Sequence, residues 1–279
     1  MLKYLKTAIK RKIARRVTKE YPIQIDEFKL KDYGAIKFAN WENPLVERKT
    51  INENYVGFLK KFIKTGDFVI DIGSNIGHMT VPLAIICGKN GLALAFDPNP
   101  YVFKILLKNA ELNNKNANIK PFNFAITDID EDYYYNSSEA SFANGGISKE
   151  KVNRHGKYSL SQKIKGINLE NFLKNQFSER LPKLKLIKID TEGYDKEIIK
   201  SISNLLIKYK PVVISECFGK SSPADRFEHF DLLKSKGYSL FHINDFSIDT
   251  EIVPITTKED MLKWKHFDFF AVKEALLFS

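Results

Sequence analysis

The sequence predicts an α/β fold with a doubly wound, mostly parallel sheet. Between residues 66 and 236, short apolar segments alternate with segments that have the spacing of amphipathic helices. Parallel strands need crossover helices, so this alternation indicates a parallel sheet covered by helices. A glycine-rich turn follows the first strand, as in nucleotide-binding α/β folds. Two late apolar segments have only a loop between them and are expected to form an antiparallel hairpin at the sheet edge.

Each element is expected where hydrophobic periodicity and turn residues agree. The strands are expected at residues 67–73, 92–96, 119–126, 184–189, 211–215, 238–243 and 267–272. The helices are expected at residues 51–64, 77–87, 101–114, 168–176, 194–208 and 224–236. Together these elements make a domain that spans residues 51–279.

The first 50 residues are expected to lead into this domain. Residues 21–50 predict irregular structure or a short hairpin. Residues 1–20 predict a basic amphipathic helix, because apolar residues recur there every three or four positions among Lys and Arg. These apolar residues are Leu2, Leu5, Ile9, Ile13 and Val17. We expect the helix to dock on its own domain. The alternatives are a frayed tail and peripheral contact with an anionic membrane or an acidic partner.

Residues 127–167 break the alternation of strands and helices. Connections longer than about 15 residues are usually functional or disordered, so we interpret this stretch as a substrate-facing insertion. A merely decorative loop is the alternative. Within it, the aromatic run Tyr133–Tyr135 could stack on a sugar or nucleoside face, and His155 is a candidate base because imidazole titrates near neutral pH.

Composition excludes several classes of protein. Two cysteines are too few for a disulfide framework, and no uncharged apolar run of spanning length or signal peptide is present, so we expect a cytoplasmic protein. The basic leader makes the inner membrane surface the alternative location. The net charge is +10, but residues 1–20 contribute +7 of it. The remaining +3 predicts no specific binding to nucleic acid.

The turn after the first strand indicates a cofactor site. Its pattern is Asp71-x-Gly73-x-Asn75-x-Gly77, which lacks the spacing of a dinucleotide-binding turn. The charge of Asp71 would repel a pyrophosphate and attract an ammonium group, which favours a zwitterionic sulfonium cofactor. Asp97 ends the next strand, where an acidic residue typically binds ribose hydroxyls.

These segments resemble the FkbM-type family of S-adenosylmethionine-dependent methyltransferases. The resemblance rests on DFVIDIGSNIGHMTVPLA, GLALAFDPNP, NFAITD, LKLIKIDTEGYDKEIIKS, PVVISE and FDFFAVKE, and covers roughly residues 50–275. It implies the class I methyltransferase fold, a Rossmann-like sheet of seven strands with the seventh antiparallel. It also implies S-adenosyl-L-methionine as cofactor and O-methylation of sugars or glycosylated metabolites.

The resemblance also implies roles for individual residues by position. The methionine end of the cofactor would meet Asp71, Gly73, Ser74, Asn75, Ile76 and Gly77. The ribose would meet Asp97 and Pro98, and the adenine edge Asn123 and Ala125. Glutamate is commoner than aspartate at position 97, which leaves only the fine geometry of ribose binding open.

Three carboxylates are the candidate catalytic residues. Asp190 and Glu192 follow one strand, and Glu216 ends the neighbouring one, so the three are expected to converge at the edge of the crevice. Two carboxylates in one cleft either share a proton, which makes a base, or bind a hard cation such as magnesium. Asp190 and Glu216 would be the metal ligands. Glu192 could instead be an ordinary acid at the start of a helix.

The sequence therefore predicts an O-methyltransferase that acts on a hydroxyl of a sugar or glycosylated metabolite, with a small-molecule or glycan acceptor as partner. The alternatives are an RNA or other small-molecule methyltransferase and an inactive cofactor-binding interaction module. The sequence gives no indication of the oligomeric state.

Overall fold

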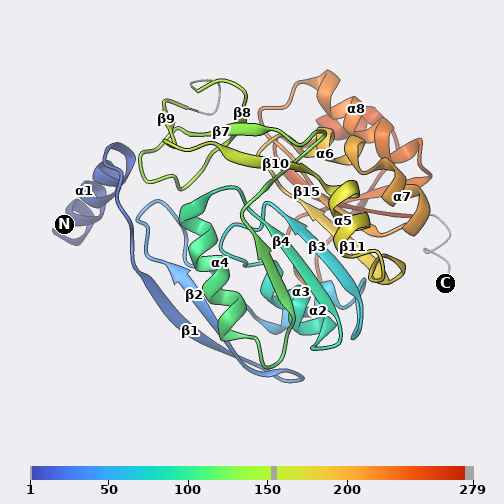
Figure 1. Ribbon diagram of the computed structural model, residues 1–279, viewed down its shortest axis with the longest axis horizontal. Coiled ribbons are helices and arrows are strands. Elements are labelled where there is room, and N and C mark those ends of the chain that lie inside the picture. The colour runs from blue at the N-terminus through green and yellow to red at the C-terminus, as the bar shows by residue number, and fades with distance from the viewer. Residues whose placement is uncertain (1, 152–155, 274–279) are drawn as a thin grey trace.

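The computed structural model describes residues 2–151 and 156–273, with side chains from Leu5 onward (Figure 1). The candidate base His155 and the side chain of Leu2 lie outside the described residues.

Eight of the described strands form the main sheet. They are β3 (Phe68–Ile72), β4 (Leu92–Phe96), β5 (Ile119–Phe122), β11 (Leu184–Ile189), β12 (Val212–Cys217), β13 (Tyr238–Ile243), β14 (Ile252–Ile255) and β15 (Phe267–Lys273). Their order is β14-β13-β15-β12-β11-β3-β4-β5. The five strands from β12 to β5 are parallel, and β15 runs antiparallel to both β12 and β13. The predicted doubly wound, mostly parallel sheet is confirmed.

The antiparallel end of the sheet is larger than expected. The predicted pair of late strands exists as β13 and β15, but β14 adds one strand beyond the expected seven. Its sequence, Ile-Val-Pro-Ile, contains a proline that cannot donate to a strand partner, which suits its place at the edge of the sheet.

Helices cover both faces of the main sheet. One face carries α2 (Glu53–Leu59), α3 (Thr80–Cys87) and α4 (Pro100–Leu112). The other carries α5 (Leu169–Gln176), α6 (Asp195–Ser201), α7 (Ser203–Tyr209) and α8 (Pro223–Lys234). The single helix expected over residues 194–208 is wrong, because the helix is interrupted at the fully buried Ile202.

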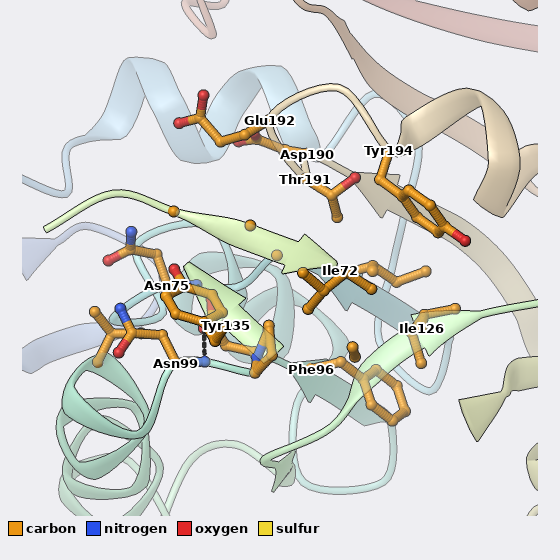
Figure 2. A pocket seen from close by; sticks show the side chains of 18 of the residues that line it. Ile72, Asn75, Phe96, Asn99, Ile126, Tyr135, Asp190, Thr191, Glu192 and Tyr194 are labelled. Atoms are coloured by element: carbon orange, nitrogen blue, oxygen red, sulfur yellow. Dashed lines mark hydrogen bonds between the residues drawn. The ribbon is translucent and has the colours of Figure 1, made fainter. Parts of the chain in front are cut away.

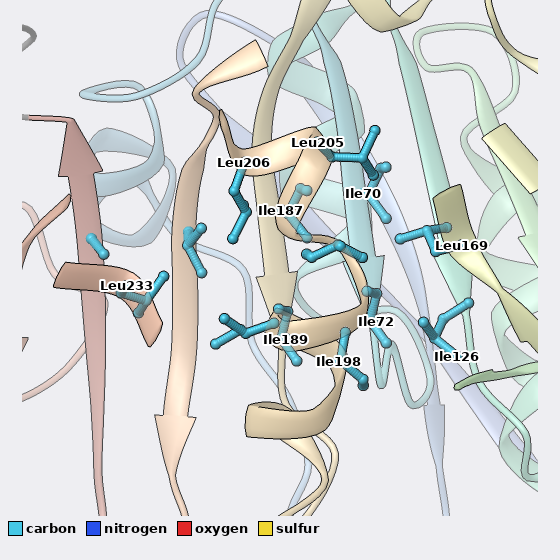
Figure 3. Close-up of a cluster of buried hydrophobic side chains, with 14 of the residues drawn as sticks. Ile70, Ile72, Ile126, Leu169, Ile187, Ile189, Ile198, Leu205, Leu206 and Leu233 are labelled. Atoms are coloured by element: carbon cyan, nitrogen blue, oxygen red, sulfur yellow. The ribbon is translucent and has the colours of Figure 1, made fainter. Parts of the chain in front are cut away.

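The buried side chains of the central strands alternate between the two faces. Ile70 and Ile72 of β3 point toward α5–α8, beside Ile187 and Ile189 of β11 (Figure 3). Because successive strand residues point to opposite faces, Asp71 lies on the other side, among α2, α3 and the strand residues that pack there. A carboxylate is thus buried in the middle of the fold, 0% exposed.

Residues 23–41 form a hairpin, which was one of the two structures predicted for residues 21–50. Strands β1 (Ile23–Leu30) and β2 (Gly34–Trp41) pair antiparallel, and β2 packs on α4. The buried amide of Asn109 on α4 accepts from Ala39 N–H at 2.6 Å and donates to Ala39 O at 3.1 Å. The hairpin therefore adds to the core on the α2–α4 face.

The insertion is folded, and it forms a second, smaller sheet. Its strands are β6 (Ala125–Thr127), β7 (Asp132–Ser137), β8 (Gly146–Ser148), β9 (Tyr158–Ser159) and β10 (Ile164–Asn168). The strand expected at 119–126 is therefore two strands, β5 in the main sheet and β6 in the small one. Tyr133 and Tyr135 are buried, so two of the three tyrosines stabilise the insertion.

The expectation that the N-terminal helix docks its apolar stripe on the domain is wrong. Helix α1 (Leu2–Arg16) forms, but Leu5, Ile9 and Ile13 remain 41–55% exposed, as does Val17 just after it. In the described part of the chain, no helix combines the length and apolar character needed to cross a bilayer.

Candidate functional site

A cavity of about 160 Å³ opens where β3 and β4 end. Gly73, Asn75 and Asp97 line one part of it. Asp190 to Glu192, together with Tyr194, line another, across the cavity from Asn75 (Figure 2). The insertion supplies Tyr135 and residues 143–147. The cavity thus lies at the carboxyl ends of parallel strands, where α/β sheets bind ligands.

Gly73 allows the turn after β3 to approach the end of β11. Its φ is +72°, and a Cβ atom there would lie 1.7 Å from the carbonyl oxygen of Asp190. The N–H groups of Gly73 and Ser74 donate to Phe96 O at 2.9 and 3.0 Å. Only glycine fits this position, because any side chain would collide with backbone.

Asp97 is held by the same turn. Its Oδ2 accepts from Asn75 N–H at 2.7 Å, and its Oδ1 accepts from Asn99 N–H at 2.9 Å. Each carboxylate oxygen can accept more than one hydrogen bond, so acceptor capacity remains toward the cavity. Burial raises the pKa of Asp97 to about 6, although the two backbone donors oppose the shift. Asp97 is therefore a rigid acceptor for hydroxyl groups.

Asp71 lies behind the cavity wall rather than in it. Its carboxylate accepts from Thr80 Oγ1 at 2.5 Å and lies 3.3 Å from the Lys188 ammonium. Lys188 also donates to Gly73 O at 3.0 Å and lies 3.3 Å from Asp190. Burial alone would lower the pKa of Lys188, but Asp190 and Asp71 outweigh it and raise the pKa. This buried cation connects Asp71 to both edges of the cavity.

The other predicted cofactor residues divide into two groups. Pro98 and Ala125 line the cavity with Gly73, Asn75 and Asp97. Four lie outside its lining and support it: Ser74, Ile76, Gly77 and Asn123. Ser74 Oγ donates to Asp71 O at 2.7 Å, and Asn123 Nδ2 donates to Asp97 O at 2.8 Å. The structure thus brings part of the predicted set to the cavity surface.

A second cavity of about 590 Å³ adjoins the first. The two share Asn144, Gly145, Glu192 and Tyr194 in their walls. The second cavity is also lined by Asp195 and Glu216 and by the lysines Lys196 and Lys220. A ligand in the first cavity would therefore meet a ligand in the second at the 190–194 loop.

Glu216 is a buried carboxyl group in the wall of the second cavity. Its Oε1 lies 2.8 Å from His266 Nε2, and its buried Oε2 has no hydrogen-bond partner among the described residues. Burial, followed by the negative charge of Asp190, raises the pKa of Glu216 to about 9. Glu216 can therefore take up a proton.

Asp195 shapes the loop between the two cavities. Its Oδ2 accepts from Thr191 Oγ1 at 3.1 Å and from Gly193 N–H at 3.2 Å. Its Oδ1 is buried and without a partner in the described part of the chain. Burial and Asp190 raise the pKa of Asp195 to about 7.

The magnesium hypothesis gains no support from the side-chain geometry. Across residues 2–151 and 156–273, no group of three or more His, Cys, Asp or Glu side chains is arranged to hold a metal ion. Asp190 is paired with Lys188, and Glu216 with His266. We therefore assign no metal site.

Several residues of these cavities were not predicted from the sequence. Lys188 could have been predicted, because a lysine inside an apolar strand must pair with buried acidic or polar groups. Asp195 resembled an ordinary acid in the first turn of a helix. Tyr135 and residues 143–147 reach the first cavity through the fold of the insertion, which has no local signature. His266 is adjacent to Glu216 only because β15 pairs with β12.

Comparison with known families decides the class of the protein. Residues 71–240 match the family of the methyltransferase FkbM domain. The chain belongs to this family. The match confirms the family resemblance drawn from the motifs.

Two curated relatives and one solved structure illustrate the relationship. Hexuronic acid methyltransferase AglP of Haloferax volcanii is 27% identical over 162 residues, 58% of this chain and 61% of AglP. The tRNA(Phe) (4-demethylwyosine(37)-C(7)) aminocarboxypropyltransferase of Pyrococcus horikoshii is 32% identical over 71 residues, 25% of each chain. Both alignments span less than two thirds of the relative. Methyltransferase FkbM of Methylobacillus flagellatus has a TM-score of 0.43 at 11% identity, covering 75% of this chain and 44% of that one.

Proposed function

We propose that this FkbM-family protein transfers a methyl group from S-adenosylmethionine to a hydroxyl of a sugar or glycosylated metabolite. The observation that carries the proposal is the pair of adjoining cavities that share the 190–194 loop. The first would take the cofactor, and the second the acceptor.

The residues of the first cavity fit the proposed cofactor. Asp97 offers two oriented oxygens to the ribose diol, and Phe124 to Ile126 offer an apolar edge to the adenine. Gly73 leaves room for close approach to backbone at the opposite end. The carboxylate of Asp190, 41% exposed and lining the same cavity, could attract the ammonium group of the methionine moiety. These contacts match the chemistry of a zwitterionic nucleoside.

The second cavity fits a polyhydroxylated acceptor. Carboxylates and ammonium groups line it, and polar groups of both kinds can bind hydroxyls. Glu216 and Asp195 line this cavity, and the buried Oε2 of Glu216 and Oδ1 of Asp195 have no partner among the described residues, so both carboxyl groups have unused acceptor capacity. The name of AglP, a hexuronic acid methyltransferase, favours a sugar acceptor.

The chemistry requires a base beside the acceptor hydroxyl. Bound S-adenosylmethionine would supply an electrophilic methyl group. The hydroxyl oxygen would gain the methyl group and lose its proton to Glu216, whose raised pKa makes the carboxylate a strong base. His266, whose Nε2 lies 2.8 Å from Oε1 of Glu216, would orient the carboxyl group. The two reactants would be held in fixed positions by Gly73, Asp97 and the 190–194 loop. Holding reactants in the reactive geometry accelerates a reaction because little further entropy is lost in the transition state.

The proposal is tested by measuring S-adenosylhomocysteine release with S-adenosylmethionine and a panel of acceptors. The panel contains free hexuronic acids, neutral hexoses, glycosylated metabolites and total RNA. We expect turnover with a carbohydrate acceptor and none with RNA. Turnover with RNA alone would favour the RNA methyltransferase reading. Cofactor binding without turnover on any acceptor would favour an inactive binding module.

Substitution of Asp97 by asparagine should weaken the binding of S-adenosylmethionine about 10- to 100-fold, because a charge-assisted hydrogen bond to the ribose is worth roughly 1.5–3 kcal/mol. Asp67→Asn is a matched control, since Asp67 is also buried and accepts from a backbone N–H, at the start of β3. Calorimetric titration of both variants with S-adenosylmethionine measures the two affinities. Equal losses in the two would refute the ribose role.

The same carboxylate predicts a pH dependence. Because the pKa of Asp97 is raised to about 6, wild-type affinity should fall as pH drops below 6, when the carboxylate becomes protonated. The asparagine variant should lack this fall.

A further inference from the structure

Helix α1 presents an apolar stripe to solvent. Leu5 is 53% exposed, Ile9 55%, Ile13 41% and Val17 50%. Among the described residues of this helix only Ala14 is buried, and at 100° per residue it lies well away from the centre of the stripe. The helix therefore contacts the domain through a different face, and the part of the stripe from Leu5 to Val17 is exposed to solvent.

The attachment of α1 to the domain is at its C-terminal end. Ser141 N–H donates to Ala14 O at 3.0 Å, and Ala140 N–H donates to Arg15 O at 3.2 Å. Arg15 Nε lies 3.6 Å from Glu139 Oε1. All three contacts come from one short segment of the insertion. Figure 1 shows α1 at the periphery of the molecule, on the side of β9 and away from α5–α8.

Cations flank the exposed stripe on both sides. The helical repeat puts Lys6 and Lys10 along one edge of the stripe, and Lys12 and Arg16 along the other. All four residues are exposed. Residues 1–20 carry a net charge of +7, against +3 for the rest of the chain. The face combines a narrow aliphatic strip with positive borders, which complements acyl chains lying between anionic headgroups.

We infer that α1 docks on the surface of an anionic lipid bilayer, with Leu5, Ile9, Ile13 and Val17 buried among the lipids. Each Lys or Arg near such a surface strengthens the binding, and burial of the aliphatic side chains strengthens it further. The continuous stripe and the cations on both borders favour a lipid surface over an acidic protein.

Docking would bring the insertion to the membrane. The segment that holds α1, residues 139–141, is separated by only one residue from residues 143–147, which line the first cavity. The enzyme would thus work on acceptors at the lipid surface. This consequence rests on the proposed function, whereas the docking of α1 does not.

The experiment is sedimentation of the full chain with vesicles of phosphatidylglycerol and phosphatidylcholine, compared with phosphatidylcholine alone. We expect binding to the anionic vesicles that is at least about tenfold stronger and is largely lost in about 0.5 M NaCl, where surface charges are screened. A double variant, Ile9→Glu with Ile13→Glu, should lose at least about tenfold in binding.

The matched control is Ile207→Glu. Ile207 on α7 is 55% exposed, the same as Ile9, and lies outside the proposed surface. This variant should bind within about twofold of wild type. Circular dichroism and thermal unfolding confirm that all variants are folded, independently of lipid and of the proposed function.

Three results would overturn the inference. They are equal binding to neutral and anionic vesicles, full binding by the double variant, and a solution oligomer that the double variant disperses. The last would assign the stripe to a second copy of this chain.

Discussion

Replacement of Gly73 by alanine should abolish measurable binding of S-adenosylmethionine. A Cβ atom at this position would lie 1.7 Å from Asp190 O and 2.8 Å from the carbonyl carbon, so the turn and the end of β11 must separate. Both segments line the first cavity. The resulting shift should cost more than 100-fold in affinity, because displacements of about 1 Å have effects of that size at well-fitted sites.

Gly34→Ala isolates the effect of this close approach. Gly34 has the same φ of +72°, but a Cβ there would meet nothing within 4 Å. Both variants incur the strain of alanine in the left-handed region, about 1–2 kcal/mol. Gly73→Ala should lower the free energy of unfolding by at least about 2 kcal/mol more, since only it creates a collision. Urea unfolding and calorimetry measure both quantities. Equal behaviour of the two variants would show that the contact with Asp190 is unimportant.

Local sequence patterns were sufficient to predict the central sheet and its glycine turn. The alternation of Ile70 and Ile72 with Val69 and Asp71 identifies a strand buried on both faces, and Gly73 marks its end. Asp97 could be predicted as a cavity residue for the same reason, because it ends the next strand along the chain. The prediction of these residues depends only on short-range periodicity and on the topology of parallel sheets.

Contacts between segments that are distant in the sequence could not be predicted from such patterns. Asp71 was expected to face the cofactor, yet the strand period turns it inward, where Lys188 neutralises its charge and Thr80 donates a hydrogen bond to it. Nothing in the sequence near Asp71 indicates which of the 44 Lys and Arg residues would reach it. The same limit applies to Glu216 and His266, 50 positions apart, which meet through an antiparallel pairing.

The N-terminal helix shows a different limit. The spacing of Leu5, Ile9 and Ile13 predicted an amphipathic helix correctly, but periodicity does not say what covers the apolar face. Docking on the domain was the default expectation. The stripe from Leu5 to Val17 is exposed, and the backbone hydrogen bonds that attach α1 to the insertion come from Ala14 and Arg15 in its last turn.

Glu216→Gln should reduce turnover by about 10²- to 10⁴-fold, the usual contribution of a general base. The amide has nearly the same shape but cannot take the proton from the acceptor hydroxyl. Affinity for S-adenosylmethionine should change less than about twofold, because Glu216 lines only the second cavity. Single-turnover methylation and calorimetry separate the two effects. Unchanged turnover would remove Glu216 from the proton transfer.

The wild-type rate should also rise with pH. The pKa of Glu216 is raised to about 9, so the basic form is scarce at pH 7 and increases as pH approaches 9. A positively charged cofactor in the first cavity would lower this pKa and move the rise to lower pH. The Gln variant should lack the corresponding limb of the pH profile.

The raised pKa of Glu216 also means that the free energy of unfolding of the wild-type protein should decrease as the pH rises from acid to neutral and above. A carboxyl group that titrates near 4.5 when unfolded and near 9 when folded favours the native state fully below pH 4.5. That contribution is lost as pH rises through the folded pKa, because the unfolded chain then ionises more easily than the native one. Glu216→Gln does not titrate, so its stability should not fall between pH 5 and pH 8 as that of wild type does, and it should be the more stable of the two at pH 8.

Glu170→Gln is the matched control for Glu216→Gln, which is expected to lower turnover and raise stability. Glu170 on α5 is also buried, but its carboxylate accepts from Asn204 N–H and Asn204 Nδ2, both at 2.9 Å. Its replacement should lower stability by roughly 1–3 kcal/mol, since one carboxylate acceptor becomes a donor, and should leave turnover unchanged. Thermal unfolding at pH 6 and pH 8 distinguishes the two variants. If Glu216→Gln were the less stable one at both pH values, the carboxyl group would be a structural acceptor and not a proton carrier.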